Sequence, residues 1–472
     1  SPDGIGGTYM RSYHYTDART SQDRGFEGFA SQQITDSRVN STVENINYSQ
    51  LFPLTGMVSE DDVLQSSGTP ISVTTYTNAS DPIDGTAQLN QRFAAYRTNV
   101  STQKYEVGGS ENGSANTLTN TAYDPPDQYG NVMHVTTTVA DEDPNTPFPG
   151  TLWTTKTTST VTPNITTWCL NLPTSIVVEK TAPGEPTITH TTSYPANDYQ
   201  YCHPTTVTTD AGDSSYDVSS ALSYDDFGNV DQTVVTGAGF TARTSTAYWG
   251  TTGQFPTKIQ NPDAYANGYQ EFVGYDPNTA LKISDVVQTT SGVNNAPPVS
   301  WTYDPFGRLQ TVGHPDGTSV SLSYSACAPS CYSSNHFQTV TQTKSGVNGS
   351  EITDKSTYLD SMGRALVVRQ RLMDGTYSQI EQQYDNLGRV VKSSAPCSAS
   401  GCVDYWTQNQ YDALGRLTQT TRQTNQNDTT PATVQFNYAG RTTTITSPTG
   451  LPGPGTSTRI SGVSGHLRKT TD

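Results

Sequence analysis

Polar and apolar residues alternate along most of this chain, in short runs separated by turn-forming residues. Residues 319–324 read Ser-Val-Ser-Leu-Ser-Tyr, which places every second side chain on one face of an extended strand. Runs rich in Thr and Val also favour strands, because β-branched side chains pack well on a pleated surface and lose freedom in a helix. We find no convincing amphipathic helix in the sequence. The pattern therefore predicts an all-β chain.

Two kinds of turn separate the expected strands. Asp316-Gly317 and Asp374-Gly375 stand between alternating runs, where Asp-Gly is the strongest short-range signal for a β-hairpin. The other turn has a longer signature, Tyr-Asp-x-x-Gly-Arg followed by Leu or Val. In it Asp suits the start of a tight turn and Gly supplies the positive φ that closes the hairpin. Three full copies contain Tyr303, Asp304, Gly307, Arg308, Tyr384, Asp385, Gly388, Arg389, Tyr411, Asp412, Gly415 and Arg416.

The signature recurs at a nearly fixed distance. Gly363, Gly388 and Gly415 lie 25 and 27 residues apart, and Gly307 lies 56 residues, or about two units, before Gly363. Each period has room for two turns and two strands of roughly 5–8 residues. Such self-similarity is typical of chains that stack one supersecondary unit on the next. We therefore expect a tandem β-hairpin strip.

Several copies depart from the signature. Leu359 stands where the full copies have Tyr, Asn229 replaces the arginine, and the copy at Asp276 lacks the glycine. The arginine is nevertheless a repeated feature, and we expect it to form cross-strand ion pairs or to bind turn carbonyls. A ladder of arginines that binds a ligand is the alternative.

Composition and charge exclude two classes of protein. Charged residues make up 15% of the chain, against about 25% in an average soluble protein, and the net charge is −17. No cluster of Lys or Arg offers phosphates a basic face, so we expect no nucleic-acid partner. No run of 18 apolar residues could span a membrane. Ser1 is not Met and no apolar leader follows it, so we expect a processed or excised piece of a longer product.

The six cysteines fall into three local pairs. An even number in close pairs favours disulfides and an oxidising compartment. Free thiols are the first alternative, and a zinc site is the second, although finger-like spacing is missing. The suspected pairs are Cys169 with Cys202, Cys327 with Cys331, and Cys397 with Cys402.

Nothing in the sequence points to a catalytic, cofactor or metal site. No Gly-x-Ser-x-Gly nucleophile motif occurs, and the neighbours Cys202 and His203 would point to opposite faces of a strand. The acidic runs at 141–143 and 60–62 carry the hard oxygens that Ca²⁺ prefers, without the spacing of a calcium loop. We interpret both runs as solvated acidic loops.

The chain divides into two regions on this evidence. Residues 1–118 hold no copy of the signature and are denser in aromatic residues and glycine, so they form a lead-in region. Residues 119–472 form the repeat array.

The signature copies resemble the YD repeats of the Rhs (rearrangement hotspot) family. Gly25-Phe26-Glu27-Gly28-Phe29 with Asp36 resembles the segment that leads into those repeats in the B components of bacterial insecticidal toxin complexes. The resemblance implies a strip of β-hairpins that spirals into a hollow shell around an unfolded toxin polypeptide, with Tyr and Leu packed between neighbouring turns. The family's core plug, self-cleaving carboxylates and variable toxin have no counterpart up to Asp472.

We therefore predict a non-catalytic scaffold or shell segment of a secreted or cell-surface bacterial toxin, whose partners are polypeptide cargo or other toxin subunits. One alternative is a structural subunit of an extracellular assembly, because repeated strands offer edges for pairing. The other is an adhesion or carbohydrate-contacting module, in which exposed tryptophans would stack on sugars. The candidates are Trp153, Trp168, Trp249, Trp301 and Trp406.

Overall fold

The structure of the chain is a computed structural model. It describes residues 7–39, 42–83, 92–146, 150–292, 297–326, 338–398, 402, 405–423, 431–447, 455–463 and 465–471. Strands dominate it, and 33 of them form one antiparallel sheet. The described helical elements are α1 (Pro262–Ala266) and the short 3₁₀ turns η1 (Ser37–Val39) and η2 (Gly109–Glu111). The all-β prediction is confirmed.

The strands follow one another along the sheet in chain order. The first half contains β1 (Arg11–Thr16), β2 (Arg19–Ser21), β3 (Gly25–Gly28), β4 (Ser31–Asp36), β5 (Thr42–Tyr48), β6 (Val58–Gln65), β7 (Pro70–Pro82), β8 (Phe93–Tyr105), β9 (Ala115–Tyr123), β10 (His134–Asp141), β11 (Leu152–Val161), β12 (Pro173–Thr181), β13 (Ile188–Asp198), β14 (His203–Thr209), β15 (Val218–Tyr224), β16 (Val230–Gly237), β17 (Phe240–Tyr248) and β18 (Lys258–Gln260).

The second half continues the same pattern with shorter strands. It contains β19 (Tyr269–Tyr275), β20 (Lys282–Thr289), β21 (Val299–Tyr303), β22 (Leu309–Gly313), β23 (Ser319–Ala326), β24 (Gln338–Ser345), β25 (Glu351–Leu359), β26 (Ala365–Arg371), β27 (Tyr377–Tyr384), β28 (Val390–Ser394), β29 (Cys397–Ser398), β30 (Trp406–Tyr411), β31 (Leu417–Arg422), β32 (Ala432–Ala439), β33 (Thr442–Thr446), β34 (Thr456–Ser461) and β35 (Leu467–Thr471).

Almost every strand pairs with its neighbours in sequence, so the sheet is a long meander. β2 and β3 form a separate hairpin between β1 and β4, and β27 pairs along one edge with both β28 and β29. Within the described residues β1 pairs only with β4, and β35 only with β34, so the sheet is open at both ends. β9 runs through the predicted boundary at residues 118 and 119. The two-region division stays a prediction.

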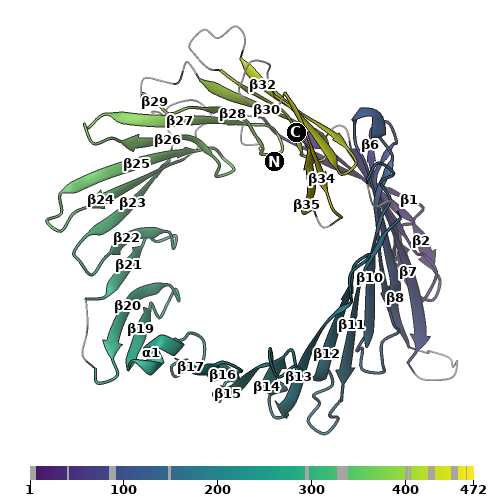
Figure 1. The fold of residues 1–472 in the computed structure, drawn as a ribbon, viewed down its shortest axis with the longest axis horizontal. Helices are drawn as coiled ribbons and strands as arrows, with labels where there is room; N and C mark the ends of the chain where they lie inside the picture. Colours follow the sequence, from purple (N-terminus) through teal and green to yellow (C-terminus); the bar gives the residue numbers. More distant parts are fainter. Residues whose placement is uncertain are drawn as a thin grey trace.

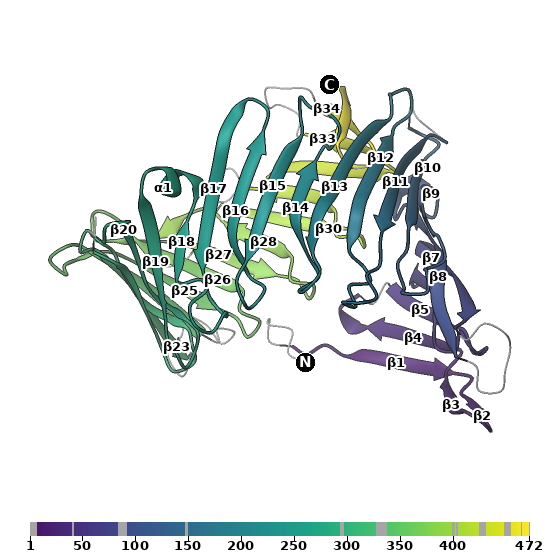
Figure 2. The ribbon, with the colours of Figure 1, turned by 90° about the horizontal axis from the view of Figure 1, so that it is seen from below.

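The strip winds into a ring. Figure 1 shows the strands following one another around the ring, from the purple N-terminal strands to the yellow C-terminal ones. In the perpendicular view of Figure 2, β1 lies at one end of the ring axis and β34 lies at the other. The strip therefore rises as it winds, and its last strands overlie part of the first turn.

The wall of this ring is one sheet thick. The accessible surface is 27134 Å², whereas a compact monomer of this mass would expose about 17,000 Å². Few apolar side chains are buried within the described residues; they are Val107, Ala140, Cys169, Leu172, Val273, Val367, Cys402 and Trp406. The sheet therefore has no opposing layer, and both of its faces are left uncovered by the rest of the described chain.

A meander places its turns alternately on two rims of the wall. The turns at 304–308, 360–364, 385–389 and 412–416 all fall on one rim, which we call the signature rim. The turns at 106–114, 142–151, 314–318 and 372–376 fall on the other, which we call the opposite rim. The repeated signature thus lies along a single rim of the strip.

Candidate functional site: the signature rim and the seam between turns

The signature turns have the backbone geometry that their sequence predicts. Asp304 accepts a hydrogen bond from the Gly307 amide at 2.9 Å and donates its own amide to the Arg308 carbonyl at 2.9 Å. Gly307, Gly388 and Gly415 have φ values of 76°, 83° and 79°. A side chain is strained in that region, so the glycine is needed for the turn.

The aspartate of each turn holds the arginine of the same turn. In the first full copy, Asp304 Oδ1 accepts the amides of Phe306 and Arg308, and Oδ2 accepts Arg308 Nε at 2.7 Å. Burial alone would raise the pKa of Asp304, but the hydrogen bonds from Arg308 and the turn amides lower it. The same Nε bond measures 2.7 Å in the turns of Asp360, Asp385 and Asp412. The ion pair is therefore made within one turn, whereas we expected either cross-strand ion pairs or binding to turn carbonyls; Arg389 shows the second of these.

Each of these arginines also reaches the next unit. The Arg364 guanidinium lies over the Tyr384 ring, 4.8 Å from its centre, and the Arg389 guanidinium lies 4.7 Å from the centre of the Tyr411 ring. Arg389 Nη1 in addition donates to the Asp412 carbonyl at 3.1 Å. Such cation–π contacts stabilise by about 0.5–1 kcal/mol at exposed sites.

The tyrosine completes the link. Tyr384 donates its hydroxyl to the carbonyl of Ala365, the residue after Arg364, at 2.9 Å. Tyr411 makes the same bond to Val390 at 2.8 Å. Tyr, Asp, Gly and Arg thus form one ladder along the signature rim, in which each unit is bound to the next.

A seam joins the end of this ladder to the first turn of the spiral. Arg416 binds its own Asp412, and its Nη1 donates to Glu106 Oε2 at 3.1 Å. Its Nη2 donates to Glu106 Oε1 and to the Val107 carbonyl, the latter at 3.3 Å. Glu106 is 1% exposed. Although burial alone would lower it, the pKa of Arg416 is raised by the hydrogen bonds to Glu106 and Asp412.

The second half of the seam corrects the interpretation of residues 141–143. Asp141 and Asp143 are buried, whereas a solvated acidic loop was expected. Asp141 forms an ion pair with Arg441 and accepts the Thr146 hydroxyl at 2.8 Å. Asp143 Oδ2 accepts the Arg441 amide at 2.8 Å, against the backbone of Gly440. Burial lowers the pKa of the Arg441 guanidinium below its ordinary value.

The seam therefore joins unlike rims. Glu106, Asp141 and Asp143 lie at the opposite rim of the first turn, while Arg416 and Arg441 lie at the signature rim of the later one. The other acidic run was also misread, because residues 60–62 lie inside strand β6 and not in a loop.

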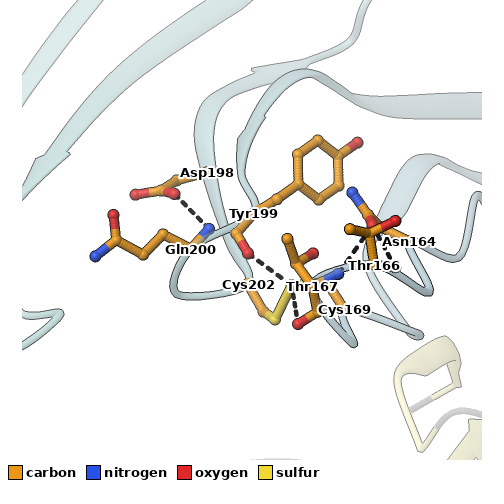
Figure 3. Close-up of a disulfide and its surroundings, with 8 residues drawn as sticks. All are labelled: Asn164, Thr166, Thr167, Cys169, Asp198, Tyr199, Gln200 and Cys202. Carbon is orange, nitrogen blue, oxygen red and sulfur yellow. Dashed lines mark hydrogen bonds between the residues drawn. A yellow bond between two sulfur atoms is a disulfide. The ribbon is translucent and has the colours of Figure 1, made fainter.

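Two of the suspected cysteine pairs are bonded in the structure. Cys169 joins Cys202 with the two Cα atoms 5.3 Å apart, and Figure 3 shows this bridge. The Asn164 side chain caps the adjoining turn by accepting the amides of Thr166 and Thr167 at 3.0 and 3.2 Å. Because Cys202 Sγ is bonded to Cys169, it has no free thiol that could act as a nucleophile beside His203.

The second disulfide joins Cys397 to Cys402. The Glu381 carboxylate and the two sulfur atoms all lie within 4.8 Å of one another. Both sulfur atoms are already bonded to each other, so this group offers no thiolate to a metal. Cys327 and Cys331 lie outside the described residues.

The tryptophans differ in their capacity to contact a sugar. Trp406 is 7% exposed, so its ring is not available for stacking, and Trp249 donates its Nε1 to the Val230 carbonyl at 2.9 Å. Trp168 is 72% exposed and has a φ of 61°. Among the tryptophans of the described chain, Trp168 is thus the one that is largely exposed.

Of the comparisons with known proteins, the one with solved structures gives matches. No family model matches the sequence, and no curated protein matches it. A crystal structure of TcdB2-TccC3 without its hypervariable C-terminal region superposes with a TM-score of 0.70 at 11% identity over 99% of this chain. This chain has the fold of the part of TcdB2-TccC3 that it matches.

Further solved structures carry the same fold. TcdB2-TccC3-TEV gives a TM-score of 0.68 at 11% identity, and the Photorhabdus luminescens Tc holotoxin pore gives 0.51 at 11% identity, each over 98% of this chain. This chain spans 36% of the length of the TcdB2-TccC3 chain. Within the part of the chain that the structure describes, no helix is long and apolar enough to cross a membrane.

Proposed function

We propose that this chain is a segment of the wall of a hollow shell that encloses another polypeptide. The observation that carries the proposal is the single-layered wall: 27134 Å² of surface, with both sheet faces uncovered by the described chain. A sheet normally buries one face against a second layer. A wall without that layer suits a container whose contents lie against one face. The seam supports the same role, because it fixes one turn of the spiral on another.

The chemistry of the chain suits a scaffold better than an enzyme. The repeated Tyr, Asp, Gly and Arg side chains are used in turns and in links between units. His134 and His190 each pair with an exposed or half-buried aspartate at 2.6 Å, at separate places on the surface. The disulfides support an oxidising compartment and hence a secreted or cell-surface protein. Within this role residues 1–118 act as the lead-in and residues 119–472 as the repeat array.

Protease protection tests the proposal. The complete gene product that contains this chain is purified, treated with a broad-specificity protease, and its surviving fragments are identified by mass spectrometry. We expect a polypeptide outside the wall sequence to survive in the native particle and to be digested after the wall is unfolded. Digestion of all such sequence in the native particle would contradict an enclosing role.

A variant of the seam provides the matched control. Glu106→Gln weakens the contact with Arg416 at the seam, whereas Glu185→Gln changes a carboxylate that lies in an exposed turn. We expect protection to decrease in the first variant and to persist in the second.

A further inference from the structure

One repeat has lost its own arginine. Asn229 stands at the arginine position, and its amide donates to Asp225 Oδ2 at 3.2 Å and to the Gly253 carbonyl at 2.8 Å. Trp249 donates to the carbonyl of Val230, the residue after Asn229, which is the bond that Tyr384 and Tyr411 make elsewhere. Trp249 thus takes the place of the tyrosine. No lysine or arginine of the described chain lies over its ring, although a guanidinium covers the ring in the full copies.

A groove opens at this incomplete repeat. It has a volume of about 830 Å³ and crosses β15, β16, β17 and β18 beside the signature rim. Phe227 and Tyr248 line it and are 58% and 54% exposed, although aromatic rings of this size are usually covered. The aromatic and acidic side chains that line it are Tyr224, Phe227, Tyr248, Trp249, Asp225, Asp226 and Asp231.

The polar groups of the groove favour a cation over a sugar. Thr246 donates to Gln260, whose amide donates to the Tyr269 carbonyl at 2.7 Å, so these groups are engaged within the sheet. Asp226 and Asp231 form no ion pair among the described residues, although Asp231 Oδ1 accepts the Ser223 hydroxyl at 2.5 Å. Lys258 is the one cation of the lining, and it lies toward Tyr248 at 5.8 Å from the ring centre.

The three lining carboxylates belong to a stretch of sequence without a positively charged side chain. Residues 181–242 contain no Lys or Arg and hold eight carboxylates. Three carboxylates against one lysine leave the lining negative, and a cleft of net negative charge raises the local concentration of cations. The carboxylates are Glu185, Asp198, Asp210, Asp213, Asp217, Asp225, Asp226 and Asp231.

We propose that this groove binds the guanidinium of an arginine from another polypeptide, beside the Trp249 ring that no guanidinium of the described chain covers. The full copies show that aspartate and an aromatic ring in this arrangement hold a guanidinium, as Arg389 shows between Asp385 and Tyr411. The carboxylates supply charge and the rings supply cation–π attraction. The inference rests on the proposed function only for the source of the arginine, because a polypeptide enclosed by the wall would supply one.

Titration with a blocked peptide that carries one arginine tests the inference. Its matched control is the same peptide with citrulline, which keeps the shape and removes the charge. We expect the arginine peptide to bind at least about tenfold more tightly than the citrulline peptide. Equal binding of the two peptides, or preferential binding of neutral glycans, would overturn the proposal.

Three variants locate the site. Asn229→Arg restores the missing side chain, and we expect it to abolish peptide binding while the fold is retained, because arginine occupies this position in the full copies. Asp231→Asn should weaken binding about tenfold, roughly the effect of one charged contact. Asp213→Asn, in the same acidic segment but outside the groove, should leave it unchanged.

Unaltered binding in Asn229→Arg would show that the peptide binds elsewhere and would contradict the proposal. Failure of the peptide test leaves protease protection of an enclosed polypeptide unaffected, so the two ideas fail separately.

Discussion

Arg416 and Glu106 form an ion pair across 310 residues of sequence. The same arginine binds Asp412 within its own turn and lies over the Tyr438 ring at 4.2 Å. One side chain therefore ends the ladder of the signature rim and also fixes the later turn of the spiral on the first. Loss of this arginine removes both contacts at once.

Arg416→Gln should destabilise the protein and loosen the seam. Removing one partner of a buried ion pair costs about 3–5 kcal/mol, and this pair is partly exposed on the arginine side, so we expect about 2–3 kcal/mol. Denaturant unfolding measures the loss, and small-angle scattering should show a wider particle. Arg308→Gln is the control, because Arg308 pairs with its own Asp304 away from the seam, and it should leave the dimensions unchanged.

Gly440→Ala should disrupt the seam more than an ordinary glycine substitution. A Cβ at Gly440 would lie 2.0 Å from Asp143 Oδ2, and the φ of Gly440 is already positive at 56°. Gly363→Ala has a similarly positive φ of 79° with nothing within 4 Å of the added carbon. We expect about 1 kcal/mol for Gly363→Ala and at least twice that for Gly440→Ala. Equal shifts in thermal unfolding would contradict the packing of the seam.

Tyr411→Phe tests the bond between units. The change keeps the ring under Arg389 and removes the hydroxyl that donates to Val390. We expect a loss of about 1 kcal/mol, because the carbonyl loses a hydrogen bond in a partly buried place. Tyr216→Phe, at a side chain that is 72% exposed, should be neutral in the same unfolding measurement.

Acid should weaken the N-terminal part of the sheet through Asp36, the last residue of β4. The side-chain hydrogen bond from Arg38 lowers the pKa of Asp36 from 3.8 to about 2. A carboxylate with a lowered pKa stabilises the fold above its ordinary pKa, and that stability is lost as the pH falls from about 4 toward 2. Asp36→Asn should therefore lower stability at neutral pH and flatten its dependence on pH in this window.

Asp61 and Asp62 act in the opposite direction. Burial raises the pKa of both carboxyls, so their charged forms oppose folding at neutral pH. Asp61→Asn should stabilise the chain at pH 7 and have little effect below pH 3. Thermal unfolding at the two pH values separates this contribution from that of Asp36.

The two disulfides should differ in their effect on stability. Cys169 and Cys202 are 33 residues apart, whereas Cys397 and Cys402 are 5 apart. Closing the longer loop constrains the unfolded chain more, by about 4 kcal/mol against about 2 in the chain-entropy description. Serine pairs at the two sites, compared by denaturant unfolding, should reproduce this order. A larger loss at the short loop would contradict it.

The hairpin turns were predictable from this sequence because each turn is determined by residues that lie close together in the chain. The aspartate and glycine of a signature turn meet within four residues, so the pattern itself gave the hairpin and the positive φ at Gly307. The partner of the arginine was harder to identify. Its aspartate lies in the same turn and its tyrosine one unit later, and no single copy of the signature contains both contacts.

The seam could not be predicted in this way. Asp141 and Asp143 resemble a solvated loop in sequence, and their partner Arg441 lies about 300 residues further along the chain. Which residues meet there depends on how many strands complete one turn of the spiral, and that number follows from twist and curvature accumulated over the whole strip. Short-range patterning does not contain it.

Because the seam joins a signature rim to an opposite rim, the wall has a direction. A further turn of the spiral can repeat the contacts of Arg416 with Glu106 and of Arg441 with Asp141 in one orientation only. An inverted turn would place arginine opposite arginine, or carboxylate opposite carboxylate, at these positions. A wall of this kind can lengthen along the axis of the ring, and it presents a different rim at each of its two ends.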